Sequence, residues 1–141
     1  MSLIETAQEI EEEFAFLDDW ELRYAHLIDL GKHNPPLSAA ERTELTKVRG
    51  CASQVWMVIE PQKDNTLSVR AESDALIVSG LISLLVRLFS NATPSEIRAF
   101  DAASYLDKIG VTGALSAQRS NGLASMLQRI HETATSLDGK T

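Results

Sequence analysis

Cys51 is the only cysteine in this 141-residue chain, and its neighbours are those of a reactive thiol. It follows Gly50, which permits a sharp backbone turn, and lies shortly before an apolar run. Lys47 and Arg49 are close in sequence, and nearby cations favour the thiolate, which is the nucleophilic form. The pattern is typical of a nucleophilic loop cysteine. The competing interpretation is a small, buried, apolar side chain.

A cysteine hydrolase or peroxidase would need a histidine base beside the thiol. His26 and His131 lie in segments with helical periodicity and His33 in a proline-rich break, so the spacing brings none of them to Cys51. The sequence contains no Cys-x-x-Cys, no His-x-x-x-His and no glycine-rich phosphate loop. A reaction that this chain carries out alone is therefore the weakest interpretation.

The charge of the chain is acidic and unevenly distributed. Its 20 acidic and 13 basic residues give a formal charge of −7. Nine of the acids and a single base, Arg23, fall in the first 29 residues. This balance argues against nucleic acid and anionic membrane surfaces as primary partners. The first residues lack the basic and apolar pattern of an export signal, and a lone cysteine cannot form an internal disulfide, so we expect a cytoplasmic protein.

Apolar periodicity and helix-start signals predict a chain of helices interrupted by one β-hairpin. Residues 55–59 are apolar and are expected to form a strand buried on both faces, and residues 66–72 alternate between apolar and polar. Three helices are expected before the hairpin: one begun by a Ser2–Glu5 capping box, one from Asp18 stopped by Gly31, and a short one begun by Ser38 and Glu41. After the hairpin we expect a core helix from Ser73 to about Ser90 and a helix begun by Thr93 to Glu96. Two more follow, a short one over residues 104–108 stopped by Gly110 and a last one capped by Ser120 or Asn121.

These elements predict an α+β fold, in which a small antiparallel sheet packs against several helices. No repeat or long linker divides the chain, so a single domain over residues 1–141 is expected.

Several short segments along the whole chain form one pattern. They are Val48-x-Gly50-Cys51-x-Ser53-x-Val55-Trp56, Ser73-Asp74-Ala75, Gly80 in the apolar helix, Thr93-Pro94, Leu115-Ser116 and Arg119-Ser120-Asn121-Gly122-Leu123. In order and spacing this pattern resembles the SufE family of sulfur acceptors. One departure from the family is Ala117, where a proline is common.

The resemblance implies that Cys51 carries sulfur as a persulfide. The donor would be a cysteine desulfurase similar to SufS, whose turnover the acceptor stimulates, and the recipient an iron–sulfur cluster scaffold similar to SufB. Pyridoxal phosphate would belong to the desulfurase, and this chain would bind no cofactor of its own and act as an accessory protein rather than an enzyme. The implied fold is shared with the scaffold protein IscU, and the chain is expected to be a monomer or a homodimer.

The resemblance also assigns roles to residues around the cysteine. It implies that the thiol rests against an apolar surface and swings out to react, with Gly50 and Ser53 in the mobile loop. Asp74 and Arg119 match family positions that contact the partner. An alternative remains open at this stage, a regulatory binding module that acts on a partner without covalent use of Cys51.

Overall fold

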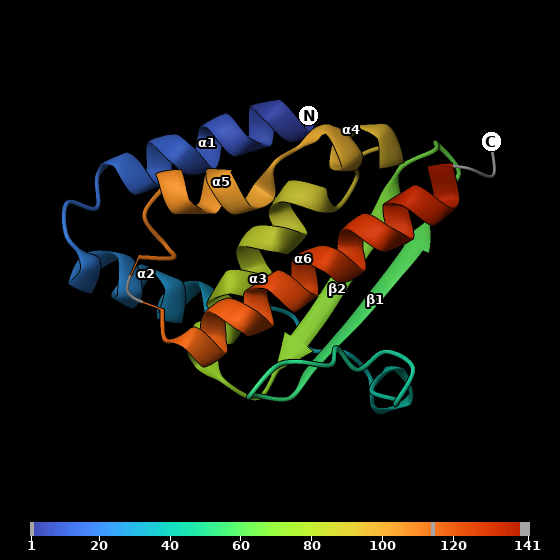
Figure 1. The fold of residues 1–141 in the computed structure, drawn as a ribbon, viewed down its shortest axis with the longest axis horizontal. Coiled ribbons are helices and arrows are strands. Elements are labelled where there is room, and N and C mark those ends of the chain that lie inside the picture. The colour runs from blue at the N-terminus through green and yellow to red at the C-terminus, as the bar shows by residue number, and fades with distance from the viewer. Residues whose placement is uncertain (1, 114, 139–141) are drawn as a thin grey trace.

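The computed structural model describes residues 2–113 and 115–138 and has the α+β architecture that the sequence predicts (Figure 1). Within these ranges helices pack against a two-stranded antiparallel sheet. None of the described helices combines the length and the hydropathy needed to span a bilayer. The elements in chain order are α1 (Leu3–Ala15), α2 (Trp20–Lys32), the 3-10 helix η1 (Ala39–Glu41), β1 (Val55–Pro61), β2 (Leu67–Ser73), α3 (Leu76–Phe89), α4 (Pro94–Ala99), α5 (Ala102–Lys108) and α6 (Ala117–Asp138).

The hairpin pairs β1 with β2 in the register that places Val55 opposite Ser73. Leu67, Val69 and Ala71 are buried, as the alternating pattern of β2 predicts. The prediction that β1 is buried on both faces is wrong in part. Val55 and Met57 are buried, but Trp56 and Val58 on the opposite face are only half-buried.

Helix α3 forms the centre of the fold, and in Figure 1 it lies between the hairpin and the pair of helices α1 and α5. Its apolar sequence predicts this burial, because a helix that is apolar almost all round has no face to present to water. The helix begins later than predicted. Ser73 ends β2, and its hydroxyl accepts a hydrogen bond from the Ala75 amide at 3.2 Å.

Two glycines let α2 and α3 approach closely. A Cβ atom on Gly80 would overlap the carbonyl oxygen of Leu27, and one on Gly31 would overlap the carbonyl oxygen of Leu76. The prediction that Gly31 stops α2 is wrong, because the helix continues to Lys32 and Gly31 does not have a positive φ. This glycine serves the contact between helices instead.

Local capping signals predict several helix starts correctly. Ser2 with Glu5 and Thr93 with Glu96 both form complete capping boxes. Glu96 also joins two helices, because one carboxylate oxygen accepts from the Thr93 amide and the other from the Leu3 amide, each at 3.0 Å. The Glu96 carboxylate thus accepts hydrogen bonds from amides at the starts of both α4 and α1, which have no acceptor within their own helices.

Helix α6 begins earlier than predicted. Its first residue is Ala117, and the Ser116 hydroxyl accepts from the Arg119 amide at 3.2 Å in the manner of an N-cap. The expected caps at Ser120 and Asn121 lie within the helix. The polar stretch is therefore the first turns of α6, which places its side chains beside the loop that precedes β1.

Replacing Gly80 with alanine should destabilise the protein by about 1–3 kcal/mol, as overpacking against an immovable neighbour does. The neighbour is the backbone of α2, which can yield only if the helix shifts. Urea denaturation measures the effect. The matched control is Gly113→Ala, because no atom lies within 4 Å of a Cβ added there, and its stability should change by less than about 0.5 kcal/mol. Equal stability of the two variants would contradict the close approach of the helices.

Candidate functional site

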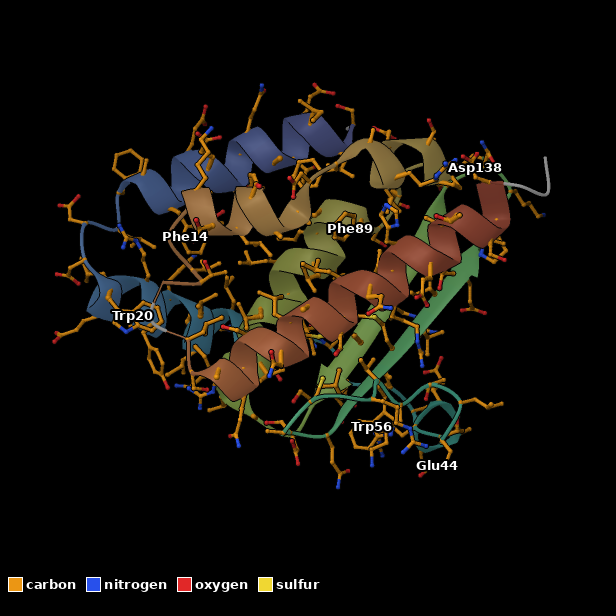
Figure 2. The ribbon with its side chains drawn as sticks, in the orientation of Figure 1. Phe14, Trp20, Glu44, Trp56, Phe89 and Asp138 are labelled. Atoms are coloured by element: carbon orange, nitrogen blue, oxygen red, sulfur yellow. The ribbon has the colours of Figure 1, made fainter. Side chains whose placement is uncertain are left out.

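Cys51 lies on a loop that leads into β1, and its side chain turns inward onto α6. The thiol is half-buried, and its Sγ lies 3.6 Å from the Gly122 carbonyl oxygen. Gly50 has φ 88°, a left-handed conformation that strongly favours glycine. In Figure 2 the labelled Trp56, at the start of β1, and Glu44, in the segment before the loop, lie at the same end of the molecule. The cysteine is therefore held at the end of the hairpin where the strand begins.

The thiol lines a small cavity between the loop, α3 and α6. Ser53 and Arg119, both expected near the site from the sequence, line this cavity together with Cys51. The remaining wall is largely apolar. Its other lining residues are Ala52, Val78, Leu81, Gln118, Gly122, Leu123 and Met126.

Two glycines make the close packing of this loop possible. A Cβ atom on Gly122 would lie 3.3 Å from the sulfur of Cys51, and one on Gly50 would lie 2.6 Å from the hydroxyl oxygen of Ser125. Gly50 is expected from the sequence to shape the loop, and here it also brings the loop against α6. Gly122 belongs to a segment that resembles the family, but no sequence pattern indicates that it lies under the thiol.

Burial and nearby charges both bear on the electrostatics of the resting thiol. Burial raises the pKa of Cys51, so the neutral thiol is favoured in this conformation. Arg49 does not act as a free cation beside the sulfur, because its guanidinium pairs with the Glu44 carboxylate at 2.8 Å on the surface. In the resting loop burial is the cause that raises the pKa of Cys51, and the expectation that Lys47 and Arg49 favour the thiolate stays a prediction.

Asp74 closes the far end of the loop. Its carboxylate accepts from the Gln54 amide at 3.0 Å, and its own amide donates to the Gln54 carbonyl at 3.3 Å. The side chain remains exposed to solvent. The residue expected to contact a partner thus has a local role as well, because it fixes the point where the Cys51 loop joins the hairpin.

The three histidines lie away from the thiol. His26 pairs with Glu13 at 3.0 Å, and His33 contacts a backbone carbonyl one turn earlier in the chain at 2.8 Å. His131 lines a separate cavity between α6 and the segment joining α4 to α5. None of the described residues that line the cavity of Cys51 is a histidine. The arrangement does not supply the base that a cysteine hydrolase requires.

The described residues also offer no cluster of metal ligands. Within residues 2–113 and 115–138, no three His, Cys, Asp or Glu side chains gather in a way that could hold a metal ion. The chemistry available at this site is that of one thiol on a loop that closes against an apolar wall.

Alkylation of Cys51 by iodoacetamide should report its burial directly. Because burial raises the pKa of this thiol, the alkylation rate of the folded protein should rise at a higher pH than that of the urea-unfolded chain. The rate near neutral pH should also be well below that of the unfolded chain. The measurement is the loss of free thiol with time across a pH series. Coinciding pH profiles for the folded and unfolded protein would contradict a buried resting thiol.

Comparisons with known proteins agree along nearly the whole chain. Residues 8–134 match the SufE family, described as an Fe-S metabolism associated domain. An uncharacterized SufE-like protein of Rhizobium etli is 47% identical over 129 residues, which are 89% of this chain and 87% of the relative. A second uncharacterized SufE-like protein, of Rhizobium meliloti, is 46% identical over 129 residues, covering 89% of this chain and 92% of the relative.

A solved structure supports the same fold at low sequence identity. The solution structure of a hypothetical protein from Thermus thermophilus is similar with a TM-score of 0.76 and 19% identity, covering 94% of this chain and 95% of that one. The family assignment rests on the sequence matches, and the structural match supports the fold alone. The chain belongs to the SufE family, whose domain is associated with Fe–S metabolism.

Proposed function

We propose that this protein accepts a sulfane sulfur on Cys51 from a cysteine desulfurase and delivers it for iron–sulfur cluster assembly. The observation that carries the proposal is the placement of the only cysteine on a short glycine-hinged loop, with its thiol closed against α6. Membership of a family associated with Fe–S metabolism supports the pathway.

The transfer is a thiol exchange that balances without an oxidant. The Cys51 thiolate attacks the outer sulfur of a donor cysteine persulfide, and a new S–S bond forms on Cys51. The S–S bond of the donor breaks, and its thiolate leaves with the electron pair and takes up a proton. Cys51 then carries the persulfide to a scaffold, where an acceptor thiolate attacks the outer sulfur, the S–S bond on Cys51 breaks and the Cys51 thiolate leaves with the electron pair. The chain itself binds no cofactor in this scheme, and pyridoxal phosphate acts in the donor desulfurase.

Opening of the loop is the step that this chain must control. The Val48 amide donates to the Val55 carbonyl at 2.8 Å, and Asp74 holds Gln54, so only the residues between these points need to move. Exposing a thiol-sized side chain costs about 1–2 kcal/mol of apolar burial. In the open loop the desolvation that raises the pKa of Cys51 is removed, so a larger fraction of the thiol is ionised at a given pH.

The residues around the loop are suited to meet the donor. Arg119 is exposed at the rim of the thiol cavity, and Asp74 is exposed at the base of the loop. We assign both to contact with the desulfurase. When the loop opens, Ser53 lines the path of the thiol, and Lys47 and Arg49 lie beside the sulfur. A cytoplasmic desulfurase similar to SufS and a scaffold similar to SufB are the partners that this assignment implies.

The direct test is the Cys51→Ser variant in a desulfurase assay with free cysteine as substrate. Wild-type protein should stimulate turnover and gain one sulfur atom, visible by intact-mass analysis and removed by reductant. Cys51→Ser should do neither, because a hydroxyl does not attack a persulfide sulfur at neutral pH. Ser95→Ala is the control, since it removes an exposed hydroxyl of α4 that does not line the thiol cavity, and it should stimulate turnover as the wild type does. Full stimulation by Cys51→Ser would overturn sulfur transfer and favour a regulatory binding module.

A further inference from the structure

The segment that leads into the Cys51 loop forms a short pairing with β1 on one edge only. Val48 donates to the Val55 carbonyl at 2.8 Å, and Lys47 faces Trp56 as an isolated antiparallel bridge. In such a ladder a residue between two hydrogen-bonded positions turns its own carbonyl away from the partner strand. The Lys47 carbonyl on the outer edge of this segment is partly buried, and a buried backbone carbonyl is costly to leave unpaired, so this edge needs another donor.

Arg129 of α6 supplies that donor. Its guanidinium nitrogen Nη2 donates to the Lys47 carbonyl at 3.0 Å and reaches the Leu45 carbonyl at 3.4 Å. Hydrogen bonds from a charged donor are stronger than neutral ones. A single side chain thus takes the place that a neighbouring strand would occupy on this edge.

The contacts of α6 with the loop form one stripe along the helix. Gly122 lies under the thiol of Cys51, Ser125 lies against Gly50, and Arg129 holds the segment before the loop. The steps of three and four residues place all three on one helical face. The first two positions allow the loop to close, while Arg129 holds its base through hydrogen bonds.

We propose that Arg129 is a positioning residue for sulfur transfer, which fixes the base of the Cys51 loop so that opening is confined to the residues after Val48. The proposal rests on the proposed function for its effect on turnover, but its effect on the free protein does not depend on that function. Without Arg129 the segment around Lys47 loses its outer anchor and moves with the loop. The thiol then spends more time exposed, and the loop no longer meets the donor in a defined position.

The first measurement is the rate at which iodoacetamide alkylates Cys51 in the free protein. Arg129→Gln should raise this rate several-fold near neutral pH, and Arg129→Lys should raise it less, because one ammonium can hold only part of the edge. The matched control is Arg87→Gln, which removes the same charge and breaks the 2.9 Å pair with Glu13 but touches no residue of the loop. An unchanged rate in Arg129→Gln, or equal increases in Arg129→Gln and Arg87→Gln, would overturn the proposal.

The second measurement is desulfurase turnover against the concentration of each variant. Arg129→Gln should raise the KM for the acceptor several-fold and leave kcat at saturation nearly unchanged, since the thiol itself is intact. An unchanged KM, or a fall confined to kcat, would overturn the positioning role. If Arg129→Gln does not fold, judged by circular dichroism, Arg129→Lys decides on the same criteria. Full stimulation by Cys51→Ser would instead overturn the proposed function, while the alkylation rates would still decide the role of Arg129.

Discussion

The thiol of Cys51 rests against the backbone of α6, and the rest of the site depends on that contact. A side chain at Gly122 would come within 3.3 Å of the sulfur, and one at Gly50 would meet Ser125. The helix in turn is positioned by its packing over the core formed around α3. The loop therefore has a defined closed state that involves few side chains, and this is a suitable arrangement for a thiol that must be protected at rest and exposed for reaction.

Burial and reactivity oppose each other at this cysteine. Desolvation raises the pKa of Cys51 and keeps it neutral, which protects a lone surface-loop thiol from oxidation and alkylation. In the function that we propose, opening the loop is itself the activating step, because burial is what raises the pKa. The ion pair of Arg49 with Glu44 is consistent with this view, since it leaves the closed thiol without a compensating charge from Arg49.

Features that depend on neighbouring residues could be predicted from the sequence, and features that depend on distant residues could not. The capping box at Thr93 and the alternation of β2 are local, and both predictions are confirmed. Gly31 is predicted to stop its helix, and the prediction is wrong because the contact that this glycine makes with α3 depends on residues distant in sequence. The burial of Cys51 and the hydrogen bond of Arg129 to Lys47 depend on contacts with α6, 71 and 82 residues apart in the chain, which no local pattern encodes.

Hydrogen–deuterium exchange in the presence and absence of a cysteine desulfurase tests the central claim most directly, which is that the loop opens between fixed ends. We expect the amides at the two ends of the loop to stay protected when the desulfurase is bound, Val48 through its 2.8 Å bond to Val55 and Gln54 through its 3.0 Å bond to Asp74. Faster exchange of either amide in the presence of the desulfurase would contradict fixed ends.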